Sequence, residues 1–147
     1  MDRRSLIRAL GGAIVAAAAL PKLAWAAWSS NAMKAGESTA AMNELFGTAD
    51  VVASAEVKLK APEIAENGAV VPLEVSTDMP AEQIAIFVDK NPSPLVMTAT
   101  MGAGATGLVK TRVRMGESSN VVAVVKSGGK LYSASQEVKV TIGGCGG

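Results

Sequence analysis

The sequence predicts an all-β protein, folded as an antiparallel sandwich or barrel, and two observations favour this class. From Val51 onward, apolar and polar residues alternate with a period of two, which is typical of half-buried strands. Turn-forming sequences interrupt the pattern at nearly regular spacing, and no long helical segment separates the strands, which disfavours a parallel α/β sheet. The 147 residues suit one small domain, and with only 3% aromatic residues its core must consist of aliphatic side chains and methionine.

The start of the chain is expected to be an export signal. Paired basic residues, Arg3 and Arg4, precede an apolar run over residues 9–20, and Ala24–Trp25–Ala26 then forms an A-x-A cleavage site. The apolar run is short for a permanent membrane helix. The paired arginines resemble a twin-arginine (Tat) signal, which predicts a periplasmic protein with no membrane segment after cleavage. An uncleaved N-terminal anchor is the alternative, and N-terminal sequencing would separate the two.

A leader and one short helix are expected between this signal and the strands. Residues 27–36 are small and polar and are expected to form a loose leader. Residues 36–46 favour a helix that Ser38 or Thr39 could cap and that Gly47 would end. Its apolar side comprises Met42, Leu45 and Phe46, and we expect it to pack at the edge of the domain. The predicted organisation is a Tat signal peptide over 1–26, a leader and helix over 27–50, a β-sandwich over 51–142 and a flexible arm over 143–147.

Seven or eight short strands are expected, most of them marked by apolar residues two positions apart. In chain order the strand sequences are Val57–Leu59–Ala61, Val71–Leu73–Val75, Ile84–Ile86–Val88, Leu95–Met97–Ala99–Met101, Val109–Thr111–Val113, Val122–Val124, Leu131–Ser135 and Val138–Val140–Ile142. Turn signals separate them at Asn67–Gly68, at residues 91–94, at residues 102–104 and at residues 127–129. Pro72 cannot donate a ladder hydrogen bond, so its strand is expected at an edge or with a bulge.

The C-terminus holds the only thiol of the chain, Cys145, between two pairs of glycines. Gly143 and Gly144 precede it, and Gly146 and Gly147 follow it. Glycine populates a wide range of φ and ψ, so the sequence predicts a flexible arm. A cysteine used for packing would have apolar neighbours, and this one has none along the chain. Five residues reach at most about 16–18 Å, which would let the thiol enter a cleft in another protein.

Several functions are disfavoured by composition. The chain has no histidine, and no charged side chain lies closer to Cys145 along the sequence than Lys139, so we expect a carrier and not an enzyme. A single cysteine cannot form an internal disulfide or a multi-thiolate metal site, and we expect neither a metal nor a cofactor. The C-terminal carboxylate would disfavour the thiolate. After the signal, the chain has ten basic and twelve acidic residues, which predicts no nucleic acid partner.

On the residues alone, other roles for Cys145 stay open. An exported lone thiol often pairs between chains, so passive dimerisation is one alternative, and no role at all is another. Prenylation does not fit, because it requires a C-a-a-X end and this chain ends in Cys-Gly-Gly.

The C-terminal sequence Val-Lys-Val-Thr-Ile-Gly-Gly-Cys-Gly-Gly, residues 138–147, resembles that of the SoxY family, the sulfur carriers of the thiosulfate-oxidising Sox system. Four further segments resemble family landmarks: Pro62–Pro72, Asp89–Pro92, Arg114–Glu117 and Gly129–Tyr132. The resemblance implies an immunoglobulin-like β-sandwich that forms a heterodimer with a SoxZ-like subunit. It also implies that Cys145 holds the sulfur intermediate covalently.

The resemblance further implies three transient enzyme partners. A haem-containing Sox enzyme would join thiosulfate to the sulfur of Cys145, a metal-dependent hydrolase would release sulfate, and a sulfur dehydrogenase would oxidise the remaining sulfane sulfur.

Two other functions are weighed against this one. A ubiquitin-like sulfur carrier also ends in Gly-Gly, but it needs activation by ATP in the cytoplasm and a long central helix. This chain is expected to be exported, and its sequence predicts no such helix, so this function is disfavoured. An immunoglobulin-like interaction module with a disulfide-linking tail is the second alternative, and a stable dimer through Cys145 would favour it.

Overall fold

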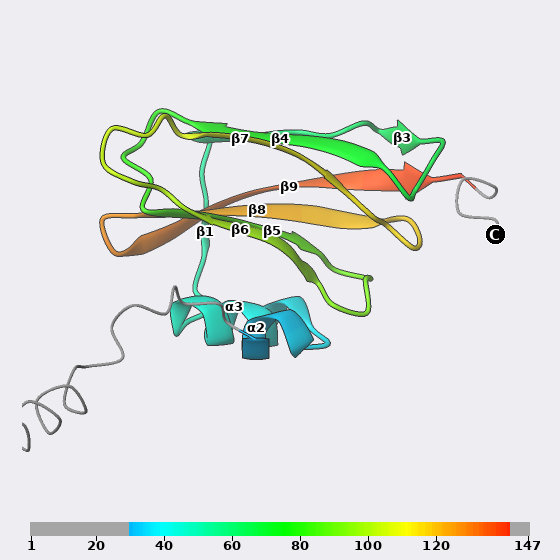
Figure 1. The fold of residues 1–147 in the computed structure, drawn as a ribbon, viewed down its shortest axis with the longest axis horizontal. Helices are drawn as coiled ribbons and strands as arrows, with labels where there is room; N and C mark the ends of the chain where they lie inside the picture. The colour runs from blue at the N-terminus through cyan, green and yellow to red at the C-terminus, as the bar shows by residue number, and fades with distance from the viewer. Residues whose placement is uncertain (1–29, 142–147) are drawn as a thin grey trace, which may run out of the picture.

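A computed structural model describes residues 30–141, which fold as a two-sheet sandwich with a pair of helices on one side (Figure 1). The helices are α2, Ser30–Lys34, and α3, Ser38–Phe46. The strands within the described residues are β1 Val52–Ala53, β2 Val57–Lys60, β3 Ile64–Ala65, β4 Val71–Thr77, β5 Gln83–Val88, β6 Leu95–Thr100, β7 Leu108–Val113, β8 Ser119–Ser127 and β9 Lys130–Val140.

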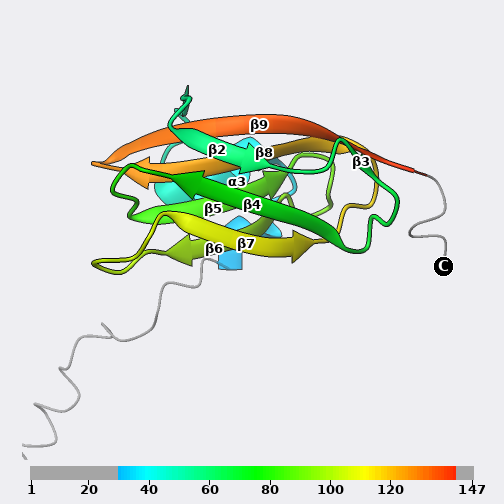
Figure 2. The same ribbon diagram turned by 90° about the horizontal axis from the view of Figure 1, so that it is seen from above.

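The larger sheet has the strand order β1-β9-β8-β5-β6, and β3 also pairs with β9. The smaller sheet has the order β2-β4-β7, and Figure 2 shows it lying across the larger one. All pairings are antiparallel except those of the two-residue strands β1 and β3, which run parallel to β9. The all-β sandwich predicted from the sequence is therefore confirmed, and the barrel is not formed.

The long strand β9 replaces two strands that the sequence pattern separated. Leu131 to Ser135 and Val138 to Val140 belong to one continuous strand, because the intervening Gln136 and Glu137 stay in register with β8. The β8–β9 turn is confirmed at Gly128 and Gly129. Both have positive φ, 58° and 76°, which glycine adopts without the steric cost of a Cβ.

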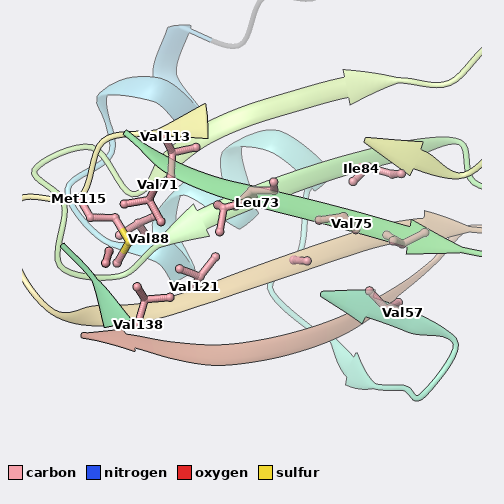
Figure 3. Packing of buried hydrophobic residues seen from close by; sticks show 14 residues of the cluster. Val57, Val71, Leu73, Val75, Ile84, Val88, Val113, Met115, Val121 and Val138 are labelled. Carbon is pink, nitrogen blue, oxygen red and sulfur yellow. The ribbon is translucent and has the colours of Figure 1, made fainter. Parts of the chain in front are cut away.

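The main core lies between the two sheets (Figure 3). Alternate residues of each strand point inward, as the period of two predicts. The fully buried inward residues include Val71 and Val75 of β4, Ile84, Ile86 and Val88 of β5, Val121 and Val125 of β8, and Val138 of β9. Burying each such side chain contributes roughly 1.5–3 kcal/mol relative to exposure. Met115, also fully buried, packs into this core beyond the end of β7.

The two helices cover the other face of the larger sheet (Figure 1). Ala32 and Met42 pack with Phe87 of β5, which is fully buried on the side away from the smaller sheet. The prediction of packing at the domain edge was therefore wrong, because a face holding a phenylalanine needs a cover. The loose leader predicted over residues 27–36 contains helix α2 over its described part, with Ala32 at its buried side.

Helix α3 begins and ends close to the predicted positions. Glu37 occupies the N-cap without a side-chain capping bond, and the Ser38 hydroxyl donates instead to Asp89 Oδ1 at 2.6 Å. That bond joins the helix pair to the end of β5. Gly47 ends the helix with φ of 77°, and its N–H donates to the carbonyl of Asn43, as expected for a left-handed C-terminal cap.

Pro72 lies on the central strand of the smaller sheet, and the pairings of β4 show no register shift, so the expectation of an edge strand or a bulge was wrong. The Thr77 N–H donates to the Gly107 carbonyl and therefore points toward β7. Because the backbone groups of successive residues in a strand point to opposite neighbours, the backbone nitrogen of Pro72 faces β2. Strand β2 ends at Lys60, opposite Glu74, before it reaches that position. No β2 carbonyl therefore needs a hydrogen bond from position 72. For this reason the central strand tolerates a proline, which has no N–H to donate.

A bulge in β6 corrects the predicted face of Leu95. The pairing with β5 shifts between Ile86–Met97 and Phe87–Leu95, which leaves Val96 as an extra residue. Leu95 therefore packs in the helix-covered cluster, while Met97 packs against the core between the sheets. The sequence pattern had placed both on one face.

Candidate functional site at the C-terminal end of strand β9

The site residues predicted from the sequence all lie outside the described residues. This holds for Cys145, for Gly143, Gly144, Gly146 and Gly147 beside it, and for Arg3 and Arg4 of the predicted signal. The structure describes the chain up to Thr141, four residues before Cys145. The candidate site within the structure is therefore the end of β9, residues 138–141, with the segments that hold it.

Hydrogen bonds hold the β9 end on both of its edges. Strand β3 lies on one edge, where the Lys139 N–H donates to the Glu63 carbonyl at 2.9 Å and the Thr141 N–H donates to the Ala65 carbonyl at 3.1 Å. On the other edge, the Val140 N–H donates to the Ser118 hydroxyl at 2.9 Å. Val138 anchors the strand in the core. These hydrogen bonds hold the chain up to Thr141, the last described residue.

The loops at the same end of the sandwich are linked to one another by hydrogen bonds. The Asn91 side chain donates to the Arg114 carbonyl at 2.7 Å and accepts from the Gly116 N–H at 3.3 Å. The Met115 N–H donates to the Gly68 carbonyl at 2.7 Å. These residues belong to three of the segments that resembled SoxY landmarks. Sequence comparison could find the segments, but not that they connect loops around the end of β9.

One titratable side chain in the described residues has a clearly shifted pKa, and sequence reasoning missed it. Glu74, on the outer side of β4, lies between Lys110 Nζ at 3.0 Å and Lys60 Nζ at 3.1 Å. The hydrogen bond from Lys110 and then that from Lys60 hold the pKa of its carboxyl below the ordinary value. The sequence signal that could have indicated these ion pairs is the alternation of charged residues along the segments that form β2, β4 and β7.

The contribution of the described residues to the candidate site is the set of hydrogen bonds that hold the end of β9. Between residues 30 and 141, no three histidine, cysteine, aspartate or glutamate side chains gather closely enough to hold a metal ion. Over the same residues, no helix is long and apolar enough to cross a membrane.

Comparison with known proteins identifies the family. The sequence signature of "Sulfur oxidation protein SoxY" matches residues 42–145, which include Cys145. Among solved structures, the sulfur carrier protein SoxY from Chlorobium limicola f thiosulfatophilum is 46% identical, with a TM-score of 0.63 over 69% of this chain and 94% of that one. A superoxide reductase (neelaredoxin) from Ignicoccus hospitalis shares the fold, at 18% identity and a TM-score of 0.51 over 58% and 80% of the two chains. Comparison with curated protein sequences finds no match.

The family match and the 46% identical structure place this β-sandwich among the sulfur oxidation proteins. The chain belongs to the SoxY family. Membership supports a carrier role in sulfur oxidation and fits a protein that is not itself a catalyst.

Proposed function

We propose that this protein is a periplasmic sulfur carrier that binds thiosulfate-derived sulfur covalently on Cys145 and presents it to Sox enzymes. The observation that carries the proposal is the anchoring of β9 by β3 and Ser118 up to Thr141. Cys145 lies four residues beyond Thr141, a chain length of at most about 13–14 Å. A firm base followed by a short glycine-rich segment suits a thiol that must reach into other proteins and yet stay attached to the sandwich.

In the proposed reaction sequence, three classes of partner enzyme accept the electrons and supply the water that the carried sulfur requires. The thiol of Cys145 and thiosulfate form a disulfide bond to a sulfonate, and a haem-containing enzyme accepts the two electrons while one proton is released. A hydrolase then adds water, which releases sulfate and a proton and leaves a persulfide on Cys145. A dehydrogenase then accepts six electrons from that sulfane sulfur, while three water molecules supply the oxygen atoms of a new sulfonate and seven protons are released. The carrier supplies the attached sulfur atom, and its partners supply the redox and hydrolytic groups.

The proposal includes a permanent partner, a SoxZ-like subunit in a heterodimer. Family membership supports a partner from the Sox system. Two of the most exposed large apolar side chains, Val52 at 63% and Ile64 at 59%, lie on β1 and β3, the two short strands that pair with β9. Covering them would remove apolar surface from water. Co-expression followed by size-exclusion chromatography tests this, and a stable monomer with no affinity for the subunit would refute it.

The test of the carrier function is Cys145→Ser, with thiosulfate-dependent electron transfer in the reconstituted system as the measurement. We expect turnover to be lost, because a hydroxyl cannot form the disulfide-type bond to thiosulfate. Thr100→Ser is the control, an equally small change at an exposed position at the end of β6, and it should retain activity. Turnover by Cys145→Ser at the wild-type rate would remove the carrier assignment.

A further inference from the structure

The outer face of the smaller sheet gathers positive charge. Lys58 and Lys60 of β2, with Lys110 and Arg112 of β7, point outward because their neighbours along each strand point into the core. We call these four residues the basic face. The side chains of Lys58, Lys60 and Lys110 are 62%, 74% and 67% exposed. Among residues 30–141 no element covers this face, since α2 and α3 lie beyond the other sheet (Figure 1).

The strand register arranges the charges in rows, and Lys60, Lys110 and Arg112 line a hollow of about 680 Å³. Lys60 lies opposite Glu74, which in turn lies opposite Lys110, so one row reads positive, negative, positive. The next row places Arg112 opposite Pro72. Glu74 already pairs with both lysines of its row. Within the described residues, by contrast, the guanidinium of Arg112 has no ion pair or hydrogen bond and remains available to a ligand.

The spacing of the cations argues against a single small anion as the occupant. Neighbouring strands lie about 4.8 Å apart, so the β2 and β7 side chains stand roughly 10 Å apart across the sheet. The carboxylate of Glu74 already fills the position between Lys60 and Lys110, and its charge would repel a sulfate-sized ion there. A protein surface with several carboxylates a strand or two apart matches the spacing. Such a surface would also place a carboxylate opposite the unpaired Arg112, where a bidentate contact is favourable.

The charge of the rest of the molecule excludes further classes of partner for the basic face. Apart from the basic face and the two acidic residues beside it, Glu74 and Asp78, residues 30–141 hold six basic and ten acidic residues. A chain that is negative elsewhere is repelled by nucleic acid and by anionic lipid. An exposed, charged and solvated face is also unlike the apolar interface of a permanent subunit. It resembles the surfaces that steer short-lived protein encounters.

We propose that the basic face docks a carboxylate-rich surface of an enzyme that acts on the carried sulfur, in a transient complex. The proposal rests on the proposed carrier function and extends it, because it assigns a second contact region on the sandwich apart from the cysteine segment. Docking through the sandwich raises the local concentration of Cys145 at the enzyme, while the cysteine segment makes the reactive contact.

The test compares two double variants with the same change in net charge. Lys58→Glu with Arg112→Glu reverses two charges of the basic face and leaves both lysine partners of Glu74 in place. Lys126→Glu with Lys130→Glu makes the same change near the β8–β9 turn, on the larger sheet. Each full-length variant, paired with the SoxZ-like subunit, serves as substrate for the haem-containing, hydrolase and dehydrogenase enzymes of the same source, assayed separately. Equal melting temperatures show that the variants are folded.

We expect the basic-face variant to raise KM at least tenfold for one or more of these enzymes at low salt, with kcat at saturation unchanged. The difference should close near 1 M NaCl, where the Debye length is about 3 Å. The control variant should stay within about twofold of wild type. Wild-type KM with all three enzymes overturns the proposal, as does an equal increase in the control. So does selective loss of SoxZ-like subunit binding, or inhibition by sodium sulfate beyond that of NaCl at equal ionic strength.

A binding measurement separates this proposal from the carrier function itself. Unloaded Cys145→Ser protein should bind the enzyme, and adding Lys58→Glu and Arg112→Glu should weaken that binding at least tenfold. If Cys145→Ser keeps full turnover, the carrier assignment fails whatever the basic face does. If turnover needs Cys145 but the basic-face variant binds like its parent, only the docking proposal fails.

Discussion

The carboxylate of Glu74 is held by two lysines from different strands, and this arrangement makes a pH dependence expected. Its pKa is lowered, first through the hydrogen bond with Lys110 and then through that with Lys60, so folding favours the ionised form. A lowered pKa in the folded state contributes stability above the unfolded-state value, about 4.5, and the contribution is lost as pH falls through the lowered pKa.

Glu74→Gln should therefore be less stable than wild type near pH 7, and the two should converge in acid. The measurement is the melting temperature of both proteins at several pH values from about 7 to 2. Glu137→Gln removes an exposed carboxylate that has no ion pair within the described residues, and it serves as the control. A difference between Glu74→Gln and wild type that is constant across this range would show that charge does not cause it.

At the C-terminus, the identity of the glycines is predicted to matter separately from the thiol. Replacing Gly143 and Gly144 by proline fixes φ near −65° at both positions. We expect enzyme-dependent loading of Cys145 to fall at least tenfold, or roughly 1.4 kcal/mol of transition-state stabilisation. Labelling of the thiol by a small reagent should be nearly unchanged. Gly146→Val tests bulk beside the sulfur in the same way. Wild-type turnover by both variants would make the glycines a passive linker.

At the scale of elements, the close approach of Gly107 to β4 sets the start of β7. The Gly107 carbonyl accepts from the Thr77 N–H at 2.8 Å, and a Cβ at position 107 would collide with the Thr77 backbone carbonyl. Gly107→Ala should therefore destabilise the fold by about 1–3 kcal/mol. Gly102→Ala is a matched control, because open space surrounds that position, and its effect should stay within about 0.5 kcal/mol. Chemical denaturation of the two variants checks this, and equal stabilities would contradict the packing argument.

The elements also show which parts of the fold could be predicted from sequence. Alternation identified most strands, because β4 and β7 bury one face and the period of two records that directly. Strand β5 is buried on both faces, so its sequence does not show that Phe87 faces a second layer. Helix α2 has only five residues, too few for a clear helical period. Its Ala32 is buried by α3 and the sheet, a tertiary contact that local sequence does not encode.

Pro72 and Leu95 illustrate the same limit at single positions. Whether a proline is tolerated on β4 depends on where β2 ends, and β2 is a different segment of the chain. The face of Leu95 depends on the extra residue in β6, which only the pairing with β5 reveals. For the candidate site, the sequence predicts Cys145 through its glycines and its family resemblance, and this prediction lies outside the described residues. It could not show that β3 and Ser118 hold the strand that leads to it.

At the scale of the whole molecule, the two proposals assign two tasks to two regions of the sandwich. The end of β9, fixed by β3 and Ser118, supports the segment that bears Cys145. The basic face lies on the outer side of the smaller sheet, away from the helix-covered side of the larger one (Figure 2). A carrier that meets several enzymes benefits from this division, because docking and delivery can then be altered independently.

The central claim, that Cys145 holds the sulfur, is tested most directly by intact mass spectrometry. The protein is incubated with thiosulfate and the haem-containing enzyme and measured without reductant, and peptide fragmentation then locates any added mass. We predict an adduct of one thiosulfate on Cys145, sensitive to thiols and absent from Cys145→Ser, which the hydrolase converts to one added sulfur atom. An unmodified thiol after enzyme turnover, or a stable dimer through Cys145 as the only product, would contradict the account.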